Sequence, residues 1–252
     1  MNLSVVIPAF NESLRLGPTL RRVVEYLKQS GLSYEVLVVD DGSTDGTSEV
    51  ARQFASEGVR VLRQEVNRGK GAVLKAGVLE SRGREVLLCD ADLSTPIEDI
   101  ERLRPHLDEA EVVLGSRAVA SSQIEQHQPF YREMMGRTFN FIIQLVGVRG
   151  LRDTQCGFKL LDGDVARQLF AELQIQRFAY DVELVWLARR HGYRVAEVGV
   201  RWKDSPSSKV NPLTDSFRMF LDVLSLRLRD WKQGRPSSSP NAARKPSRSP
   251  GR

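Results

Sequence analysis

The sequence predicts an α/β protein whose mostly parallel β-sheet is covered by helices on both faces. Short, nearly continuous apolar runs recur through the first half, and a segment of helical pattern follows most of them. Such runs are typical of strands that are buried on both faces of a parallel sheet. The chain has 252 residues, of which 41% are hydrophobic. It is therefore long enough for one large α/β domain.

The first half alternates strands and helices in the order of βα units. We expect strands over 3–8, 35–41, 59–65, 85–90 and 110–117. Helices are expected over 19–31 and 48–58, and residues 67–83 are expected to form a loop that leads into a helix. After the fourth strand, Thr95, Pro96 and Glu98 predict a helix start. Thr95 would be the N-cap, Pro96 the first helical residue and Glu98 the partner that closes a capping box.

The second half departs from this regular alternation. We expect a helix over 129–147, a loop and strand over 153–161, a helix over 180–192, a strand over 193–202 and a last helix over about 214–231. On a helical projection the last helix carries one apolar stripe, made by Phe217, Phe220, Leu221, Leu224, Leu228 and Trp231. No internal repeat is apparent. We expect one domain over 1–232.

The charge of the protein is concentrated at its C-terminus. The net charge is +5, and residues 233–252 carry five Lys and Arg residues and no acid, so the rest of the chain is near neutral. A neutral body argues against nucleic-acid binding by the fold. The Ser/Pro/Arg-rich tail is expected to be disordered. It would either contact anionic lipid or nucleic acid weakly, or act only as a solubilising tail.

Two cysteines, Cys89 and Cys156, form neither a disulfide framework nor a metal-ligand cluster, which favours a reducing compartment. The N-terminus shows no signal-peptide pattern, and no apolar run is long enough to span a membrane. We therefore expect a protein of the cytoplasm, or of the cytoplasmic face of a membrane.

Two carboxylates follow the fourth predicted strand, in "EVLLCDADLSTP". Asp90 and Asp92 lie two residues apart, and in extended backbone such residues project to the same face. Like charges this close repel each other unless a cation lies between them. A divalent metal ion with an anionic ligand is one solution, and a turn with two solvated acids is the other.

Polar segments follow four consecutive predicted strands. They are residues 8–12, 40–43, 67–71 and the pair Asp90 and Asp92. Because ligands bind beyond the carboxyl ends of parallel strands, these segments predict one site. The glycines and two cations of "NRGKG" suit a diphosphate. Neither a P-loop nor a G-x-G-x-x-G fingerprint is present.

Taken together, "VVIPAFNE", "VVDDGSTDGT", "NRGKG" and "DADLS" resemble the family 2 glycosyltransferases of the GT-A fold, over roughly residues 2–117. The resemblance implies a nucleotide-sugar donor, and a Mg²⁺ or Mn²⁺ ion held by Asp90 and Asp92. The ion would stabilise charge on the departing diphosphate. The donor-binding residues that the resemblance implies are Pro8, Phe10, Glu12, Val39, Asp41, Arg68, Lys70, Asp90, Ala91 and Lys209.

The second half looks like the dolichyl-phosphate sugar synthases, through "GSR", "PFYR", "RDTQCGFKLL", "FAYDVEL" and "SPSSKV". "DTQCGFK" and "DVEL" look in particular like the glucose synthases. This implies inverting transfer, with UDP-glucose as favoured donor, to polyprenyl phosphate. Arg117 and Arg132 would bind the acceptor phosphate, and Lys209 would cover the donor. Asp92, Arg117 and Asp181 are the candidate catalytic residues. Asp181 and Glu183 would orient sugar hydroxyls or assist as a base, or else Asp181 would serve as a helix N-cap.

Other functions stay open at this point. One keeps the enzyme class with GDP-mannose as donor or with a soluble acceptor. A sugar-1-phosphate nucleotidyltransferase would need a G-G-x-G-T-R-L-type loop, which "PAFNESLRLG" does not supply. A catalytically silent binding protein would not need Asp90, Asp92, Arg117 and Lys209. The helix over 129–147 and the last helix would either lie in a membrane interface or pack on the body.

Overall fold

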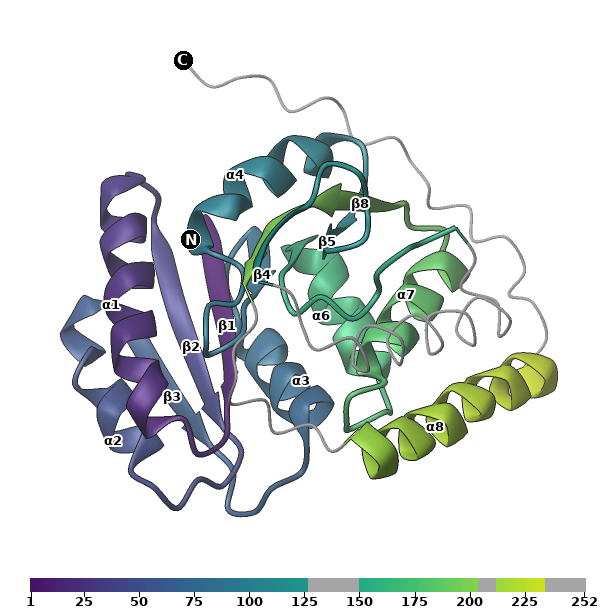
Figure 1. Ribbon diagram of the computed structural model, residues 1–252, viewed down its shortest axis with the longest axis horizontal. Helices are drawn as coiled ribbons and strands as arrows, with labels where there is room; N and C mark the ends of the chain where they lie inside the picture. Colours follow the sequence, from purple (N-terminus) through teal and green to yellow (C-terminus); the bar gives the residue numbers. More distant parts are fainter. Residues whose placement is uncertain (127–149, 204–211, 234–252) are drawn as a thin grey trace.

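A computed structural model of the chain describes residues 1–126, 150–203 and 212–233 (Figure 1). The strands are β1 (Leu3–Ala9), β2 (Tyr34–Asp40), β3 (Val59–Arg63), β4 (Glu85–Leu88), β5 (Val112–Ser116), β6 (Gln123–Gln126), β7 (Lys159–Asp162), β8 (Val195–Gly199) and β9 (Arg201–Lys203). Seven of these form the main sheet in the order β3-β2-β1-β4-β7-β5-β8, and β6 pairs with β9.

The main sheet is parallel except at β7. This strand lies between β4 and β5 and runs antiparallel to both. The other pairs are all parallel, which confirms the mostly parallel sheet that the apolar runs predict. Parallel pairing brings the carboxyl ends of β1, β2 and β4 to one edge of the sheet.

The strand expected over 193–202 is divided between the two sheets. Val200 separates β8 from β9: its amide donates to Ser116 O at 3.1 Å, at the end of β5, and its carbonyl accepts from Gln123 N at 3.1 Å. The chain therefore leaves β5 at the point where that strand ends and pairs next with β6. A continuous apolar pattern does not reveal such a change of partner.

The α-helices are α1 (Ser13–Gln29), α2 (Thr47–Arg52), α3 (Lys70–Glu80), α4 (Ile100–Leu103), α6 (Gly163–Glu172), α7 (Tyr180–Arg190) and α8 (Pro212–Gln233). Short 3₁₀ turns occupy Ala55–Glu57, Ile97–Asp99 and Arg104–Asp108. The helix expected over 48–58 thus ends early. The predicted capping box is wrong: Pro96 is itself the N-cap in extended conformation, and no side chain caps this turn.

The two faces of the sheet build two apolar cores. On one face, Val5 and Ile7 pack with α1, α2 and α4. On the other, Val6 packs with α3, α6, α7 and α8. The change of face between successive residues follows the period of two of a strand. Burying each such side chain contributes about 1.5–3 kcal/mol. Figure 1 shows α1 and α3 on either side of β1.

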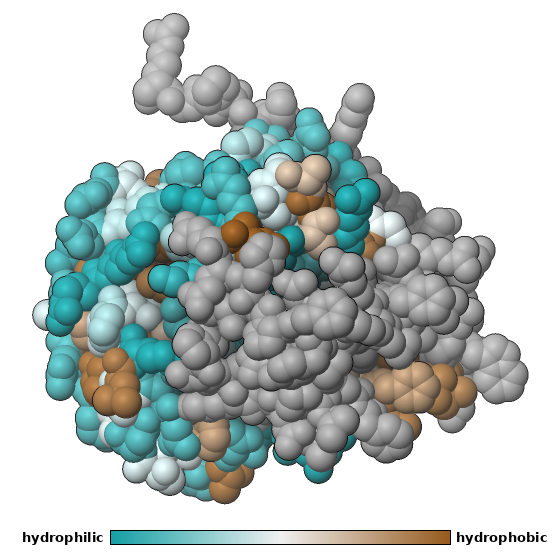
Figure 2. Space-filling model, in the orientation of Figure 1, coloured by the Kyte–Doolittle hydropathy of each residue, from teal (hydrophilic) through white to brown (hydrophobic). Residues whose placement is uncertain are grey.

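Helix α8 packs on the body through a face other than the predicted apolar stripe. Met219, Val223 and Leu226 are buried in the core beside α7. Four residues of the predicted stripe are exposed instead: Phe220 (38%), Leu221 (47%), Leu224 (43%) and Leu228 (56%). Figure 2 shows apolar surface at the lower right, where Figure 1 places α8. The helix therefore has one apolar face toward the core and a second toward solvent.

Candidate active site

Hydrogen bonds join the segments that follow β1 and β2. Asn11 N donates to Ser43 Oγ at 2.9 Å, and Thr44 N donates to Asn11 Oδ1 at 2.9 Å. Asn11 adopts a positive φ of 52°, a conformation that asparagine tolerates better than most residues. These contacts fix the segment that carries Phe10 and Glu12 beside the segment that carries Asp41.

Asp41 holds the glycine-rich loop that begins at Asn67. Its two carboxylate oxygens accept from Arg68 N at 2.7 Å and Gly69 N at 2.8 Å, and the residue is only 3% exposed. Gly69 has φ +103°, and a Cβ atom there would lie 2.7 Å from Gln176 O, so glycine is required. Asp41 therefore positions the loop. Its predicted contact with the nucleoside stays a prediction.

Lys70 begins α3 and forms an ion pair with Asp90. Its Nζ lies 2.6 Å from Asp90 Oδ1. Burial raises the pKa of Asp90, but the cations Lys70, Lys159 and Arg117 lower it by more. The pKa of Asp90 therefore lies below its usual value. Gly157 leaves the room for this carboxylate, because a Cβ at position 157 would lie 1.9 Å from Asp90 Oδ2.

Asp92 has different neighbours. Its Oδ1 accepts from Ser94 N at 3.0 Å, and its Oδ2 lies 3.9 Å from Arg15 Nη1. Arg15 is held by Glu12, which accepts from Arg15 Nε at 2.7 Å and from Arg15 Nη2 at 2.6 Å. Each acid of the D-x-D pair thus faces a cation from a separate helix, α3 or α1, which explains how two carboxylates are accommodated here.

A buried ion pair that the sequence did not predict joins Lys159 to Asp181. Lys159 is fully buried at the start of β7 and donates to Asp181 Oδ1 and to Cys156 O. Burial raises the pKa of Asp181, and Lys159 and Lys70 offset only part of that rise. The N-cap of α7 is Ala179, so the alternative role of Asp181 as an N-cap is wrong.

Arg117 lies at the end of β5 in a bidentate ion pair with Asp153. The Nε and Nη2 atoms of Arg117 lie 2.6 and 2.9 Å from the two Asp153 oxygens, and its guanidinium lies 5.5 Å from the Trp202 ring. Asp153 N in turn donates to Glu197 Oε1 at 2.7 Å. Burial lowers the pKa of Arg117, but Asp153 raises it by more, so Arg117 stays charged.

The remaining candidate residues are distributed as follows. Pro8 and Phe10 are half-buried at the end of β1, and Arg68 is exposed. The side chain of Val39 packs in the core on the α3 side of the sheet. Ala91 is buried, and its carbonyl accepts from Thr19 Oγ1 at 2.7 Å. Arg132 and Lys209 lie outside the described residues.

The carboxylates present fit a hard divalent cation. Among the described residues, no cluster of three or more His, Cys, Asp or Glu side chains is found. The pair Asp90 and Asp92 therefore offers oxygen ligands only, and few of them. Mg²⁺ is commonly bound in proteins through one or two carboxylates together with substrate phosphates. This donor set suits an ion that arrives with a diphosphate.

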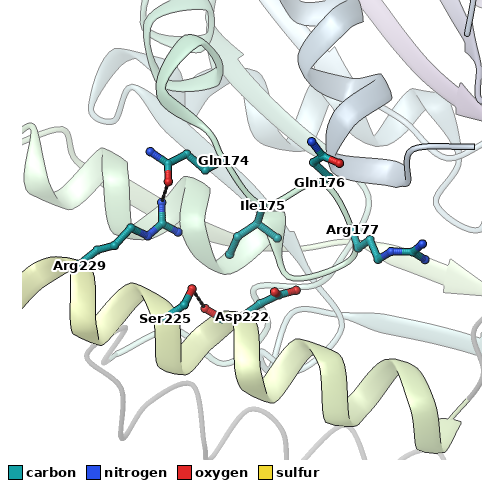
Figure 3. Close-up of a pocket in the computed structure, with 7 residues that line it drawn as sticks. All are labelled: Gln174, Ile175, Gln176, Arg177, Asp222, Ser225 and Arg229. Atoms are coloured by element: carbon teal, nitrogen blue, oxygen red, sulfur yellow. Dashed lines mark hydrogen bonds between the residues drawn. The ribbon is translucent and has the colours of Figure 1, made fainter.

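A pocket of about 490 Å³ lies between α8 and the segment that precedes α7 (Figure 3). Arg229 of α8 donates to Gln174 Oε1 at 2.7 Å across it. The same guanidinium lies 2.7 Å from Glu183 Oε1, and Glu183 is fully buried. Glu183 Oε2 accepts from Gln174 N at 3.0 Å and from Ile175 N at 2.6 Å. Glu183 is therefore occupied by structural contacts and is not a free base.

Comparison with known proteins agrees with this geometry. The model of the family described as Glycosyl transferase family 2 matches residues 4–170. The chain is similar to a dolichyl-phosphate beta-glucosyltransferase of Dictyostelium discoideum, at 36% identity over 90% of this chain and 74% of that protein. The protein of the same name from Mus musculus is 38% identical over 90% of this chain and 75% of its own length.

Solved structures share the fold at low sequence identity. Glucosyl-3-phosphoglycerate synthase from Mycobacterium tuberculosis, crystallised with Mn²⁺, UDP and glucosyl-3-phosphoglycerate, superposes with a TM-score of 0.69 at 20% identity. The match covers 90% of this chain and 79% of that one. Mannosyl-3-phosphoglycerate synthase from Rubrobacter xylanophilus gives a TM-score of 0.66 at 19% identity, over 96% of this chain and 78% of the other.

Proposed function

Because the chain belongs to glycosyl transferase family 2, we propose that it transfers glucose from UDP-glucose to dolichyl or another polyprenyl phosphate. The product is a polyprenyl-phosphate monosaccharide, formed with inversion at the sugar carbon. The GT-A fold and the glycosyltransferase class that the motifs indicate are confirmed by the family match.

One observation carries the choice of substrates. Relatives that are 36–38% identical over about 90% of this chain are named dolichyl-phosphate beta-glucosyltransferase. The similarity extends through both halves of the chain, so it includes the residues after β5 that lie beyond the donor motifs. We therefore base both the proposed donor and the proposed acceptor on the names of these relatives.

The residues at the edge of the sheet supply what this reaction requires. The acceptor phosphate is already ionised at neutral pH, so a strong general base is not needed. This agrees with the engagement of Asp181 by Lys159. Asp90 and Asp92 would hold Mg²⁺ or Mn²⁺, which when bound stabilises negative charge on the departing diphosphate. Lys70 supplies a further cation beside the diphosphate.

Arg117 is proposed to meet the acceptor phosphate together with Arg132. Asp153 engages Nε and Nη2 of Arg117, so the guanidinium is held in a fixed orientation. A guanidinium held in this way loses little conformational entropy when it binds a phosphate. Asp153 is therefore proposed as the residue that orients Arg117.

A lipid acceptor requires contact with a membrane surface. No helix within the described parts of the chain is long and apolar enough to cross a bilayer. We assign the contact to the exposed face of α8, formed by Phe220, Leu221, Leu224 and Leu228 and called here the outer face. An amphipathic helix with such a face lies in the plane of the interface.

The test is a transfer assay with purified protein. UDP-glucose, UDP-galactose and GDP-mannose are each incubated with Mg²⁺ or Mn²⁺ and with a polyprenyl phosphate, and the lipid fraction is analysed by mass spectrometry. We expect a hexosyl polyprenyl phosphate with UDP-glucose, and none when metal is removed by a chelator. A product with GDP-mannose alone would overturn the donor assignment. Transfer only to a soluble acceptor would overturn the lipid assignment.

A further inference from the structure

We propose that Lys70 neutralises Asp90 until the donor arrives and then moves to the donor's diphosphate, so that binding of the divalent metal depends on the nucleotide. This inference rests on the proposed function in one respect, namely that the donor is a nucleoside diphosphate sugar. It deepens that function by naming what controls access of the metal to its ligands.

The first support is the contact itself. Lys70 Nζ lies 2.6 Å from Asp90 Oδ1, at the place where a carboxylate would meet a metal ion. Both side chains are partly exposed, Lys70 at 22% and Asp90 at 34%. A ligand from solvent can therefore reach the pair. The lysine ammonium is a compact point charge on a flexible stem, so it can change partner without movement of α3.

The second support is the set of acids around Lys70. The ammonium of Lys70 interacts electrostatically with Asp90, Asp181 and Asp92. These three carboxylates come from the segment after β4 and from the start of α7. Asp90 also faces the cations Lys159 and Arg117. Lys70 is thus a cation in direct contact with the D-x-D pair, and its side chain is also partly exposed to solvent.

The third support is the position of Lys70 at the start of α3. The helix spans Lys70–Glu80, and the N-terminus of a helix carries a partial positive charge that favours an anion. Asp41 holds the preceding amides of Arg68 and Gly69, so the loop keeps its shape. A diphosphate that lies at this helix end is within reach of the Lys70 side chain.

The consequence is an order of events. Without nucleotide, a divalent ion that approaches Asp90 meets a carboxylate already neutralised and an ammonium that repels it. With nucleotide, the diphosphate attracts Lys70 and offers the ion its own oxygens. Because coupling between two ligands is reciprocal, the metal must increase nucleotide affinity by the same factor as the nucleotide increases metal affinity.

The test measures Mn²⁺ binding by electron paramagnetic resonance of the free ion, with and without UDP, after correction for binding of Mn²⁺ to UDP alone. We compare the wild type with Lys70→Met. Without UDP, we expect Lys70→Met to bind Mn²⁺ up to about fivefold more tightly, the factor that corresponds to the loss of one partly exposed ion pair. With Mn²⁺ present, we expect it to bind UDP more weakly than the wild type. The two changes have opposite signs, which a general loss of packing does not produce.

Lys75→Met is the matched control, because it removes the same charge from the same helix. Lys75 donates to the carbonyls of Ala171 and Leu173, away from the D-x-D pair. We expect unchanged Mn²⁺ affinity in this variant. Lys70→Gln repeats the test with a polar side chain, should Lys70→Met fail to fold. In an Asp90→Asn background, Lys70→Met should change Mn²⁺ affinity less than it does in the wild type, because only the repulsion between the ammonium and the ion remains.

Folded Lys70 variants with unchanged Mn²⁺ affinity in the absence of UDP would overturn the exchange of partners. A wild type that binds Mn²⁺ equally well with and without UDP would overturn it too. Failure of the proposed function has a different signature, since the wild type would then bind no UDP even with Mn²⁺ present.

Discussion

Glu183 of α7 and Arg229 of α8 form an ion pair of 2.7 Å whose carboxylate is fully buried. The other Glu183 oxygen accepts from two backbone amides, those of Gln174 and Ile175. One carboxylate therefore joins α7, α8 and the segment between α6 and α7. That segment also contacts the first turn of α3, because Ala72 N donates to Gln176 O at 2.9 Å.

Glu183→Gln should destabilise the protein by about 3 kcal/mol, because a buried charge pair is broken and Arg229 keeps its charge. Both Glu183 oxygens accept hydrogen bonds, so the NH₂ group of a glutamine at this position would point a donor at another donor, either Arg229 or the backbone amides. Urea unfolding followed by circular dichroism measures the change. Glu172→Gln is the control, since Glu172 is 46% exposed beside His191, and a change within about 0.5 kcal/mol is expected there. Equal effects of the two substitutions would show that Glu183 does not join these elements.

Much of the fold follows from apolar periodicity alone. The runs around Val5, Val36 and Leu87 predict three central strands, and these residues are fully buried in the sheet. The antiparallel direction of β7 does not follow, because a short apolar run such as Lys159–Asp162 carries no information on strand direction. The break at Val200 is also set by the partner strands and not by the local sequence.

The sequence predicts that the candidate site residues gather at strand ends, but it does not predict their ion pairs. Asp90 and Asp92 sit at strand ends, where the sequence places them, but the partners Lys70 and Arg15 come from helices far away in the chain. Lys159 looks like an ordinary polar residue at the end of "CGFK". Its only signal was a cation beside an apolar strand, which suggests a buried partner of opposite charge.

The sequence predicts which residues of α8 share an apolar face, but it does not predict which face packs on the body. A helical projection finds the residues that share a face, and Phe220, Leu221, Leu224 and Leu228 are indeed exposed together. It does not say which of two apolar faces packs on the body. Met219, Val223 and Leu226 form the face that does. The choice depends on the shape of the surface beside α7, which the local sequence does not contain.

Asp153→Asn should lower the free energy of unfolding by an amount that depends on pH. Burial raises the pKa of Asp153, but Arg117 lowers it by more, so the folded pKa lies below the value in the unfolded chain. The pair therefore stabilises the native state above the unfolded pKa, near 3.9, and this stabilisation is lost as the pH falls through the folded pKa. We expect a loss of about 2–4 kcal/mol at pH 7 and a smaller difference between variant and wild type below pH 4.

Urea unfolding at several pH values measures this difference. Asp164→Asn is the matched control, because Asp164 is 93% exposed in a surface pair with Arg167. It should change stability little at any pH. A deficit of Asp153→Asn that stays constant from pH 7 to pH 3 would contradict the linkage.

Asp92→Asn should abolish transfer and leave the fold intact. Asp92 is partly exposed, and within the described residues it contacts one backbone amide and, at 3.9 Å, a guanidinium, so little stability is expected to depend on its charge. Loss of an anionic metal ligand should lower kcat/KM by about a hundredfold or more. Product formation and thermal unfolding are measured together, with Asp108→Asn as an exposed control. Wild-type activity in a folded Asp92→Asn protein would remove the metal role of this residue.

Arg117→Ala should impair use of the lipid phosphate more than binding of the nucleotide. Its guanidinium is fixed by Asp153 at the end of β5, so its loss removes a positioned cation without touching the loop that Asp41 holds. We expect a raised KM for polyprenyl phosphate and a nearly unchanged Kd for UDP by calorimetry. The assignment would fail if UDP affinity collapsed while saturation by the acceptor stayed the same.

The outer face of α8 leads to a prediction that separates packing from membrane contact. Phe220→Asp replaces a 38% exposed side chain, so the variant should fold with a stability close to that of the wild type. It should sediment more weakly than the wild type with anionic liposomes, because about 1 kcal/mol of insertion is lost and an acid is placed against lipid headgroups. Val223→Asp is the matched comparison, since Val223 is fully buried, and this variant should unfold.

Salt separates the two forces that would hold α8 at a membrane. Arg218 is exposed on the helix, and residues 234–252 add five further cations, each of which contributes about 1 kcal/mol near an anionic surface. Moderate salt screens these charges but leaves the apolar contact, so it should weaken sedimentation of the wild type without abolishing it. Removal of residues 234–252 should have a similar partial effect. A folded wild type that ignores anionic liposomes at low salt would defeat the assignment, because both forces are at their strongest under that condition.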